Sequence, residues 1–314
     1  MDRASKIWLN GKIVDWDDAR IHVLTHALHY GTAVFEGIRA YRTAQGTAIF
    51  RLSDHVWRLI NSAKIYLMDL NLSADEISDA IKSTVTANGF EECYIRPIAY
   101  YGYGEMGVNP LANRVEFAVA AWPWENYLGK EAQTRGIRCM VSSWRRINPL
   151  TLPPQAKASA NYANAALAKI EAVKAGYDEA IMLNTSGMVS EGTGENIFRV
   201  KRGILSTPNA SAGILRGITR DTVIQLATDA RVKCQRIDIS REELYTSDEL
   251  FLCGTAAGIT PVSEVDGRRV GDGDYRITRK LQRTYDDVVH GRNPNYEQWL
   301  DYPLKVHIPS MASP

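Results

Sequence analysis

An aromatic stretch that contains proline and glycine interrupts the regular patterns of the chain. Residues 122–129 read Trp-Pro-Trp-Glu-Asn-Tyr-Leu-Gly, which suits a loop beside a ligand better than a helix or a strand. The chain has 314 residues, and chains of this length usually divide into more than one hydrophobic core. We therefore expect one domain at residues 1–121 and a second at residues 134–314, joined by a linker at residues 122–133.

The composition is that of an ordinary globular protein. Hydrophobic residues make up 45% and charged residues 23% of the chain, and the formal net charge is +1. A charge this small gives no reason to expect a nucleic-acid partner or an anionic membrane surface. The four cysteines are widely separated and form no Cys-x-x-Cys pair, so we expect reduced core thiols and no metal site: Cys93, Cys139, Cys234 and Cys253.

We expect no targeting signal at the beginning of the given sequence. Met1 to Lys6 is charged and leads directly into a predicted strand, which is unlike a secretory signal peptide. No apolar run has the length that a membrane-spanning helix needs. We therefore expect a cytoplasmic protein without membrane attachment.

The part before the interruption has the pattern of an α+β unit. Asn10-Gly11 between two short apolar runs predicts a hairpin over residues 7–14. Ser53 is expected to cap a helix, and Ser73 with Glu76 forms a capping box for a second helix that ends at Gly89. Strands are predicted at residues 93–101 and 114–121.

The part after the interruption mixes strands with helices. Helices are predicted at residues 161–175, from Gly217 to Ala227, after the capping box of Ser240 and Glu243, and at residues 275–290. Strands are predicted at residues 137–142, 180–183, 188–189, 196–200 and 250–254, and residues 307–314 look like a loose tail.

Four short segments of this second part contain candidate functional residues. Lys157 lies in a run of small residues just before a helix, and residues 190–198 hold two glutamates and two glycines between strands. Gly217-Ile218-Thr219-Arg220 begins a helix, and residues 254–261 read Gly-Thr-Ala-Ala-Gly-Ile-Thr-Pro. Each segment alone has a plain explanation, because a lysine before a helix is usually solvated and glycines are common in turns.

In this order the four segments resemble the fold-type IV enzymes that use pyridoxal 5′-phosphate (PLP). Residues 29–39, His-Tyr-Gly-Thr-Ala-Val-Phe-Glu-Gly-Ile-Arg, and Tyr94-Ile95-Arg96-Pro97 are similar to the branched-chain amino acid aminotransferases within that group. The likeness extends from about Ile7 to about Val289. It implies a mixed α/β fold with a small N-terminal α/β domain and a larger C-terminal domain that contains a barrel-like sheet.

The resemblance also implies a reaction. Members of the family transfer the amino group of L-leucine, L-isoleucine or L-valine to 2-oxoglutarate by a ping-pong mechanism on PLP. They form homodimers whose active site takes residues from both subunits, and some form hexamers. Alternatives within the fold type are a D-amino acid or (R)-amine transaminase and an aminodeoxychorismate lyase. A non-catalytic binding protein on the same fold is a further alternative.

The family assigns three residues to the centre of the site, namely Lys157, Glu191 and Tyr162. Lys157 holds PLP and, once the substrate has displaced it, moves a proton between substrate and cofactor. Glu191 faces the pyridine nitrogen and keeps it protonated, whereas Glu195 is expected to be a structural acid nearby. Tyr162 lies beside the cofactor O3′. The plain alternatives are a turn-capping role for either glutamate and a packing role for the tyrosine.

Phosphate binding is assigned to a helix start and two side chains. The segment Gly217-Ile218-Thr219 offers free N–H groups at the positive end of a helix dipole. Arg58 would add charge-assisted hydrogen bonds, and Thr255 a further contact. The alternatives are simple capping by Thr219 and a solvated helix arginine at position 58.

The substrate is assigned to the first domain and to the turn after Gly254. Tyr94 and the turn would hold the α-carboxylate, aromatic residues would form an apolar side-chain pocket, and Arg96 would pair with the distal carboxylate of 2-oxoglutarate, assisted by Arg39. The alternatives are core aromatics, a tight turn without a ligand, and a structural ion pair of Arg96. The expected substrate residues are Tyr30, Phe35, Gly37, Arg39, Tyr94, Arg96, Trp124, Tyr127, Thr255, Ala256 and Ala257.

Two departures from the family pattern are visible. Gly258 occupies a position where we expect a larger residue, often glutamate. The segment Ala158-Ser159-Ala160 is bulkier than a glycine-rich lysine loop. Neither removes a chemical group that the expected reaction needs.

Overall fold

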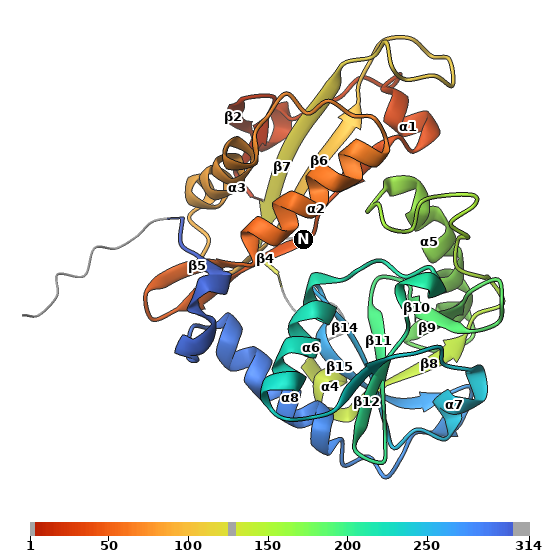
Figure 1. The fold of residues 1–314 in the computed structure, drawn as a ribbon. Coiled ribbons are helices and arrows are strands. Elements are labelled where there is room, and N and C mark those ends of the chain that lie inside the picture. The colour runs from red at the N-terminus through yellow and green to blue at the C-terminus, as the bar shows by residue number, and fades with distance from the viewer. Residues whose placement is uncertain (1–3, 125–129, 304–314) are drawn as a thin grey trace, which may run out of the picture.

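The computed structural model describes residues 4–124 and 130–303. Figure 1 shows two parts, each built around one β-sheet, with the first part above the second. Helices and strands alternate in both, so the molecule has the mixed α/β character that the sequence predicts.

The first sheet has eight strands among the described residues, in the order β17-β5-β4-β6-β7-β1-β2, with β3 paired to β6. The hairpin of β1 and β2 turns at Asn10 and Gly11, which both have positive φ, and it pairs Ile7 with Val14 as predicted. The strands are β1 (Lys6–Leu9), β2 (Lys12–Asp15), β3 (Ala33–Phe35), β4 (Ile38–Thr43), β5 (Gly46–Phe50), β6 (Cys93–Tyr101), β7 (Val115–Trp122) and β17 (Leu300–Asp301).

Two helices cover one face of this sheet. α2 (Leu52–Ile65) and α3 (Ala74–Asn88) pack on Ile38, Ala40 and Ile95, which form their common core with the helix residues. The capping box of Ser73 and the end of α3 at Gly89 are confirmed. The prediction that Ser53 caps α2 is wrong, because the N-cap is Arg51 in a left-handed conformation.

The opposite face of the sheet points toward the second part of the molecule. Arg39 on β4 lies directly opposite Tyr94 on β6, and Tyr41 and Arg96 lie two residues further along the same strands. Successive side chains of a strand alternate between faces, so these four residues share one face, and the core residues Ile38, Ala40 and Ile95 the other.

The second sheet has nine strands in the described part of the chain, in the order β10-β9-β8-β15-β14-β11-β12-β13, with β16 paired to β15. β10 contacts β11, although several strands separate them in the sheet order, which shows that the sheet curls back on itself (Figure 1). The strands are β8 (Ile137–Val141), β9 (Glu179–Leu183), β10 (Val189–Gly192), β11 (Asn196–Lys201), β12 (Ile204–Thr207), β13 (Cys234–Arg236), β14 (Glu249–Gly254), β15 (Gly258–Val265) and β16 (Arg268–Arg269).

Helices surround the curled sheet. A buried carboxylate, Glu249 on β14, accepts hydrogen bonds from the Ile277 and Thr278 N–H groups and so caps α8 (Arg276–Val289), whose own N-cap residue offers no side-chain bond. The remaining helices of the described chain are η1 (Trp16–Asp18), α1 (His26–Tyr30), α4 (Lys130–Arg135), α5 (Ser159–Lys174), η2 (Ala210–Ala212), α6 (Ile218–Asp229), α7 (Arg241–Tyr245), α8 (Arg276–Val289) and η3 (Pro294–Trp299).

Two segments connect the parts in addition to the stretch around residue 124. β17, near the end of the chain, pairs with β5 of the first sheet. Ala156 and Ala158 are buried in the hydrophobic core of the first sheet although α5 follows them directly. The division of the chain at residues 122–133 stays a prediction, and residues 125–129 of that linker lie outside the described ranges.

No helix in the described ranges is long and apolar enough to cross a membrane.

Candidate active site

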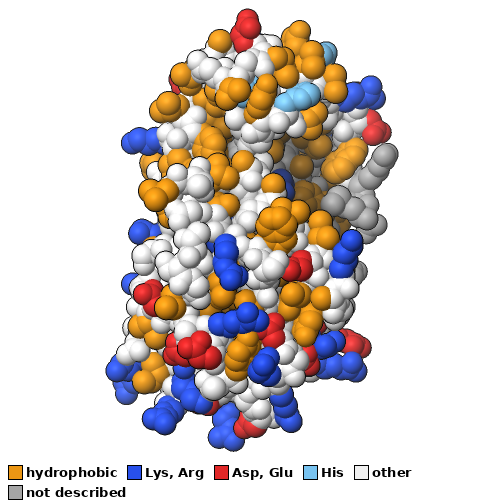
Figure 2. All heavy atoms as spheres, turned by 90° about the vertical axis from the view of Figure 1, so that its right-hand side faces the viewer, with side chains coloured by type: hydrophobic (Ala, Val, Ile, Leu, Met, Phe, Trp, Pro, Cys, Tyr) orange, Lys and Arg blue, Asp and Glu red, His pale blue; other side chains and the backbone are white. Residues whose placement is uncertain are grey.

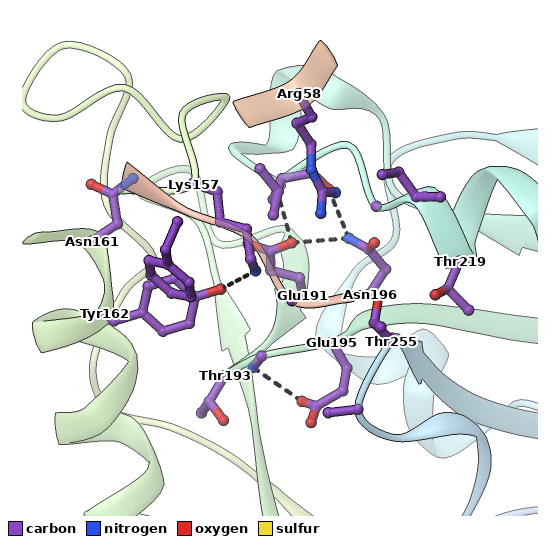
Figure 3. Close-up of a pocket in the computed structure, with 18 of the residues that line it drawn as sticks. Arg58, Lys157, Asn161, Tyr162, Glu191, Thr193, Glu195, Asn196, Thr219 and Thr255 are labelled. Atoms are coloured by element: carbon purple, nitrogen blue, oxygen red, sulfur yellow. Dashed lines mark hydrogen bonds between the residues drawn. The ribbon is translucent and has the colours of Figure 1, made fainter. Parts of the chain in front are cut away.

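A cavity of about 400 Å³ lies between the two parts of the molecule. This size is within the range of small-molecule sites. Its walls come from β3, β6 and α2 of the first part, and from the segment before α5, β10, the start of α6 and the turn after β14 in the second part. Figure 3 shows Arg58, Lys157 and Glu191 close together although they come from separate elements.

Lys157 projects into this cavity from a chain segment that is held on both sides. Its N–H donates to Ser62 Oγ of α2 at 3.0 Å, and its carbonyl accepts from the Phe35 N–H of β3 at 3.0 Å. The Asn161 side-chain amide donates to the carbonyls of Pro153 and Ala156 and so fixes the preceding turn. The Lys157 Nζ is 2.6 Å from the Tyr162 hydroxyl oxygen.

Glu191 on β10 is a buried carboxylate at the far wall of the cavity. Arg146 Nε lies 2.9 Å from its Oε1, and Asn196 Nδ2 and the Leu215 N–H donate to its Oε2 at 2.9 and 3.0 Å. Burial raises the pKa of Glu191, although the charge of Arg146 acts in the opposite direction. The charge of Lys157 lowers the pKa of Glu191 as well. The amine and the carboxyl group therefore lie in one enclosed space.

The start of α6 forms another wall and has free backbone donors. Gly217 is the N-cap residue, and among the described residues no side chain caps the first turn. A Cβ atom on Gly217 would lie 2.0 Å from Asn196 Oδ1, so glycine at this position is what allows Asn196 to reach Glu191. Thr219 is buried and lines the cavity beside these N–H groups. The N-terminus of a helix with unused N–H groups is an anion-binding feature.

Arg58 on α2 reaches the same wall and is held by a buried acid. Its Nε and Nη2 donate to Glu36 at 2.6 and 2.7 Å, and its Nη1 donates to the Arg216 carbonyl at 3.1 Å. His55 Nδ1 lies 2.8 Å from the same carboxylate. Burial alone would raise the pKa of Glu36, but the charge of Arg58 and the hydrogen bonds from Arg58 and His55 lower it well below its usual range.

Glu195 at the edge of the cavity has fewer hydrogen-bond donors around its carboxylate than the neighbouring buried acid Glu179. Burial, and next the negative charge of Glu179, raise the pKa of Glu195. Glu179 accepts bonds from Lys169, Thr193 and the Ala180 N–H, whereas among the described residues the Glu195 carboxylate accepts only from the Gly194 N–H. Of these two neighbouring acids, Glu179 therefore has more hydrogen-bond donors around it than Glu195 has.

The wall contributed by the first sheet is mostly aromatic. The Phe35 and Tyr162 rings lie 4.9 Å apart, and Tyr94 and Trp124 lie 4.7 Å apart. Arg96 lies above the Phe35 ring at 4.6 Å and donates to the Tyr94 hydroxyl at 3.2 Å. A Cβ on Gly37 would lie 1.9 Å from that hydroxyl oxygen, so only glycine leaves room for it. The result is an apolar pocket with one cation at its side.

The structure brings most of the predicted site residues to this cavity. The predicted residues that line it are Phe35, Gly37, Arg58, Tyr94, Arg96, Trp124, Lys157, Tyr162, Glu191, Gly217, Ile218, Thr219, Thr255 and Ala256. Their chemical roles stay predictions.

Four predicted substrate residues are not among those that line the cavity. Tyr30 is an exposed residue of α1 whose hydroxyl donates to the Met106 carbonyl. Arg39 lies on the same sheet face as Tyr94 but lines a second cavity. Ala257 is buried in the turn beyond Ala256. Tyr127 lies outside the described residues.

Three residues that pair with charged groups of the site were not predicted from the sequence. Arg146 and Asn196 both bind Glu191, and neither has a local pattern that separates it from a surface residue. Glu36 did have a signal, because it is the one charge in the run Val-Phe-Glu-Gly-Ile at residues 34–38. An acid in such a run is buried and needs a cation, which here is Arg58.

Comparison with known proteins agrees with this geometry. Residues 33–265 match the family described as amino-transferase class IV. The branched-chain-amino-acid aminotransferase of Escherichia coli (strain K12) is 45% identical over 301 residues, which cover 95% of this chain and 97% of that protein. The enzyme of the same name from Pseudomonas aeruginosa is 46% identical over 299 residues, with 95% and 97% covered.

Solved structures of the same group superpose closely. The Escherichia coli branched-chain amino acid aminotransferase has a TM-score of 0.94 at 44% identity and covers 96% of this chain and 100% of its own. The T.th. branched-chain amino acid aminotransferase with pyridoxamine 5′-phosphate has a TM-score of 0.94 at 48% identity, with 97% and 100% covered. The same T.th. enzyme is also known in complex with N-(5′-phosphopyridoxyl)-L-glutamate.

The chain therefore belongs to the class IV aminotransferases, and within them to the branched-chain-amino-acid aminotransferases. The predicted family, enzyme class and fold class are confirmed by these likenesses.

Replacement of Glu36 by alanine is expected to destabilise the protein strongly. Arg58 would lose both bonds to the carboxylate while remaining largely buried, and breaking a buried pair in this way costs about 3–5 kcal/mol. Urea unfolding measures the change. Glu91→Ala is the matched control, because Glu91 pairs with Arg42 at the surface, where about 0–1 kcal/mol is expected. Equal losses in the two variants would contradict the role given to Glu36.

Proposed function

We propose that this enzyme transfers the amino group of L-leucine, L-isoleucine or L-valine to 2-oxoglutarate, with PLP bound at Lys157. The observation that carries the proposal is the convergence of the Lys157 amine, the buried Glu191 carboxylate and the uncapped start of α6 on one cavity. Close relatives named branched-chain-amino-acid aminotransferases, one of them known with pyridoxamine 5′-phosphate, support it.

The residues present fit PLP by the chemistry of their donors. The free N–H groups at the start of α6 and the Arg58 guanidinium suit the phosphate. Glu191, with its own charge balanced by Arg146, suits a protonated ring nitrogen. Tyr162 suits an oxygen substituent close to the lysine. When bound, PLP supplies an electron sink for the negative charge that forms at the substrate α-carbon.

The protein then contributes binding and proton transfer. The Lys157 Nζ accepts the α-proton of the amino acid and returns a proton during amino transfer, as a general base and acid. The 2.6 Å contact with the Tyr162 hydroxyl orients the amine between these steps. The aromatic wall excludes water from an apolar side chain, and Arg96 takes the distal carboxylate of 2-oxoglutarate in the same pocket. The two substrates bind in turn, which is a ping-pong scheme.

An exposed apolar surface supports a dimer as the working unit. Val23, Leu28, Val108 and Leu111 are more than half exposed, and contacts from α1 to residues 103–107 place these two segments side by side. Figure 2 shows hydrophobic side chains gathered at the upper end of this face. Exposed patches of this kind are usually interfaces. A second copy of the chain on this surface would explain why Tyr30 is exposed here instead of lining the cavity.

Mixing the pure holoenzyme with leucine alone tests the amino-transfer proposal. The visible absorbance of the lysine-bound cofactor is expected to fall without any acceptor present, because the first half-reaction leaves the amino group on the cofactor. Lys157→Ala should lower turnover by at least about 100-fold, the usual minimum for a lost general base. Lys174→Ala, at the exposed end of α5, is the control and should keep wild-type turnover. An unchanged spectrum, or an active Lys157→Ala variant, would refute the assignment.

Replacement of Arg96 by glutamine is expected to separate the two substrates. A charge-assisted hydrogen bond is worth about 1.5–3 kcal/mol, so the KM for 2-oxoglutarate should rise about 10- to 100-fold. The KM for leucine should change far less, because an apolar side chain makes no ion pair. Steady-state kinetics measures both, with Arg42→Gln at the exposed end of β4 as the control. If both KM values rise equally, Arg96 only packs against the aromatic wall.

Light scattering tests the dimer. The chain has a mass of 35.0 kDa, so a particle of at least twice that mass is expected. Leu28→Asp should shift the population toward monomer and lower activity, since it places a charge in the proposed interface. A monomeric and fully active wild-type protein would contradict the proposal.

A further inference from the structure

A second cavity, of about 590 Å³, lies between the same two parts of the molecule. The turn after β14 separates it from the first cavity, because Thr255 and Ala256 line the first and Gly258 and Ile259 line the second. β4, α4 and α8 supply most of its remaining wall. None of the residues proposed above for amino transfer depends on this second space.

Arg39 faces this cavity, and no polar partner for it is found among the described residues. Its guanidinium carbon lies 4.5 Å from the centre of the Tyr41 ring, and its Nε is buried without a hydrogen bond. Within residues 4–124 and 130–303, no carboxylate pairs with it. A buried N–H group left without an acceptor costs free energy, so an acceptor in the cavity would be bound favourably.

Arg283 on α8 also lines this cavity and is an exposed cation. Among the described residues its guanidinium donates only to the Arg279 carbonyl, at 3.3 Å, and forms no ion pair. Arg279 itself differs, because its Nη atoms donate to the carbonyls of Gln133 and Thr134 and to Gln282. Two arginines in one cavity therefore have donors to spare.

The carboxylates of the cavity do not neutralise these arginines. Asp286 binds Arg292 and His290, and Asp287 binds Arg292 at 2.9 Å. Glu92 lies 3.7 Å from His290. All three acids are thus bonded to groups other than Arg39 and Arg283, so among the described residues neither arginine has a carboxylate bonded to it.

Gly258 leaves the wall opposite these charges without a side chain. Its φ is +62°, and a Cβ built on it would meet only Gln133 Nε2, at 3.6 Å. There is consequently open space at the wall where a side chain would otherwise project.

We propose that this second cavity binds a small oxyanion, a phosphate or a carboxylate, through Arg39 and Arg283. The planar guanidinium group presents paired donors that match the oxygen atoms of both classes. The site would lie beyond the turn that carries Thr255, and it is separate from the place proposed for the cofactor phosphate.

Titration of the holoenzyme with inorganic phosphate in a calorimeter tests the site, because bound cofactor already fills the first phosphate position. A parallel titration with acetate distinguishes a phosphate site from a carboxylate site. Arg39→Gln and Arg283→Gln should each weaken binding of the anion about tenfold or more, as expected for a lost charge-assisted bond. Arg276→Gln is the control, since Arg276 lies on the same helix but is exposed and paired with Asp274. It should leave binding unchanged.

A second pair of variants separates charge from shape. Asp and Asn both tolerate positive φ better than other side chains, so both can replace Gly258. Gly258→Asp puts a carboxylate into the cavity and should abolish binding of phosphate, whereas Gly258→Asn should retain it. Absence of saturable binding of either anion to the wild-type holoenzyme would overturn the proposal. So would unchanged binding in both arginine variants, or equal loss in the two Gly258 variants.

Discussion

The position of the Lys157 amine depends on the burial of two alanines. Ala156 and Ala158 are packed in the core of the first sheet, and Ala158 forms a bridge with Val34. In an extended segment neighbouring side chains point to opposite sides, so burying both alanines turns Lys157 outward into the cavity. The chain thus uses apolar burial on one side of a strand to aim a polar group on the other.

This anchoring also joins the two parts of the molecule at the site itself. Lys157 is bonded through its backbone to α2 and β3, while its side chain meets Tyr162 of α5. Movement of one sheet against the other would therefore strain these bonds directly. A reaction that needs an amine within bonding distance of a bound group benefits from such a rigid connection.

The buried acids around the cavity follow one rule of charge balance. Glu36 is matched by Arg58, Glu191 by Arg146 and Glu179 by Lys169. Glu195 forms no ion pair within the described part of the chain, and burial raises its pKa. An ionised acid without a partner would be costly in this environment. Among the described residues, no carboxylate is bonded directly to the Lys157 amine. The amine therefore stays available for chemistry.

The sequence predicted local features well and spatial partners poorly. The hairpin at Asn10-Gly11 and the capping box at Ser73 depend on residues close in the chain, and both were correct. The sequence did not reveal that Arg51 is the N-cap residue of α2. The guanidinium group of Arg51 binds Asp221, and that partner is distant in sequence. The contact of Arg146 with Glu191 has the same origin, since it forms only when the second sheet curls.

Arg39 shows where reasoning from strand position reaches its limit. It lies opposite Tyr94 on neighbouring strands and shares its face of the sheet, so a prediction that placed both in one site was reasonable. The turn at residues 255–258 comes from the other sheet, and it divides the space over this face into two cavities. Which cavity a side chain enters is therefore decided by an element far away in the sequence. The same sheet face can in this way serve an aromatic pocket around Tyr94 and a cationic one around Arg39.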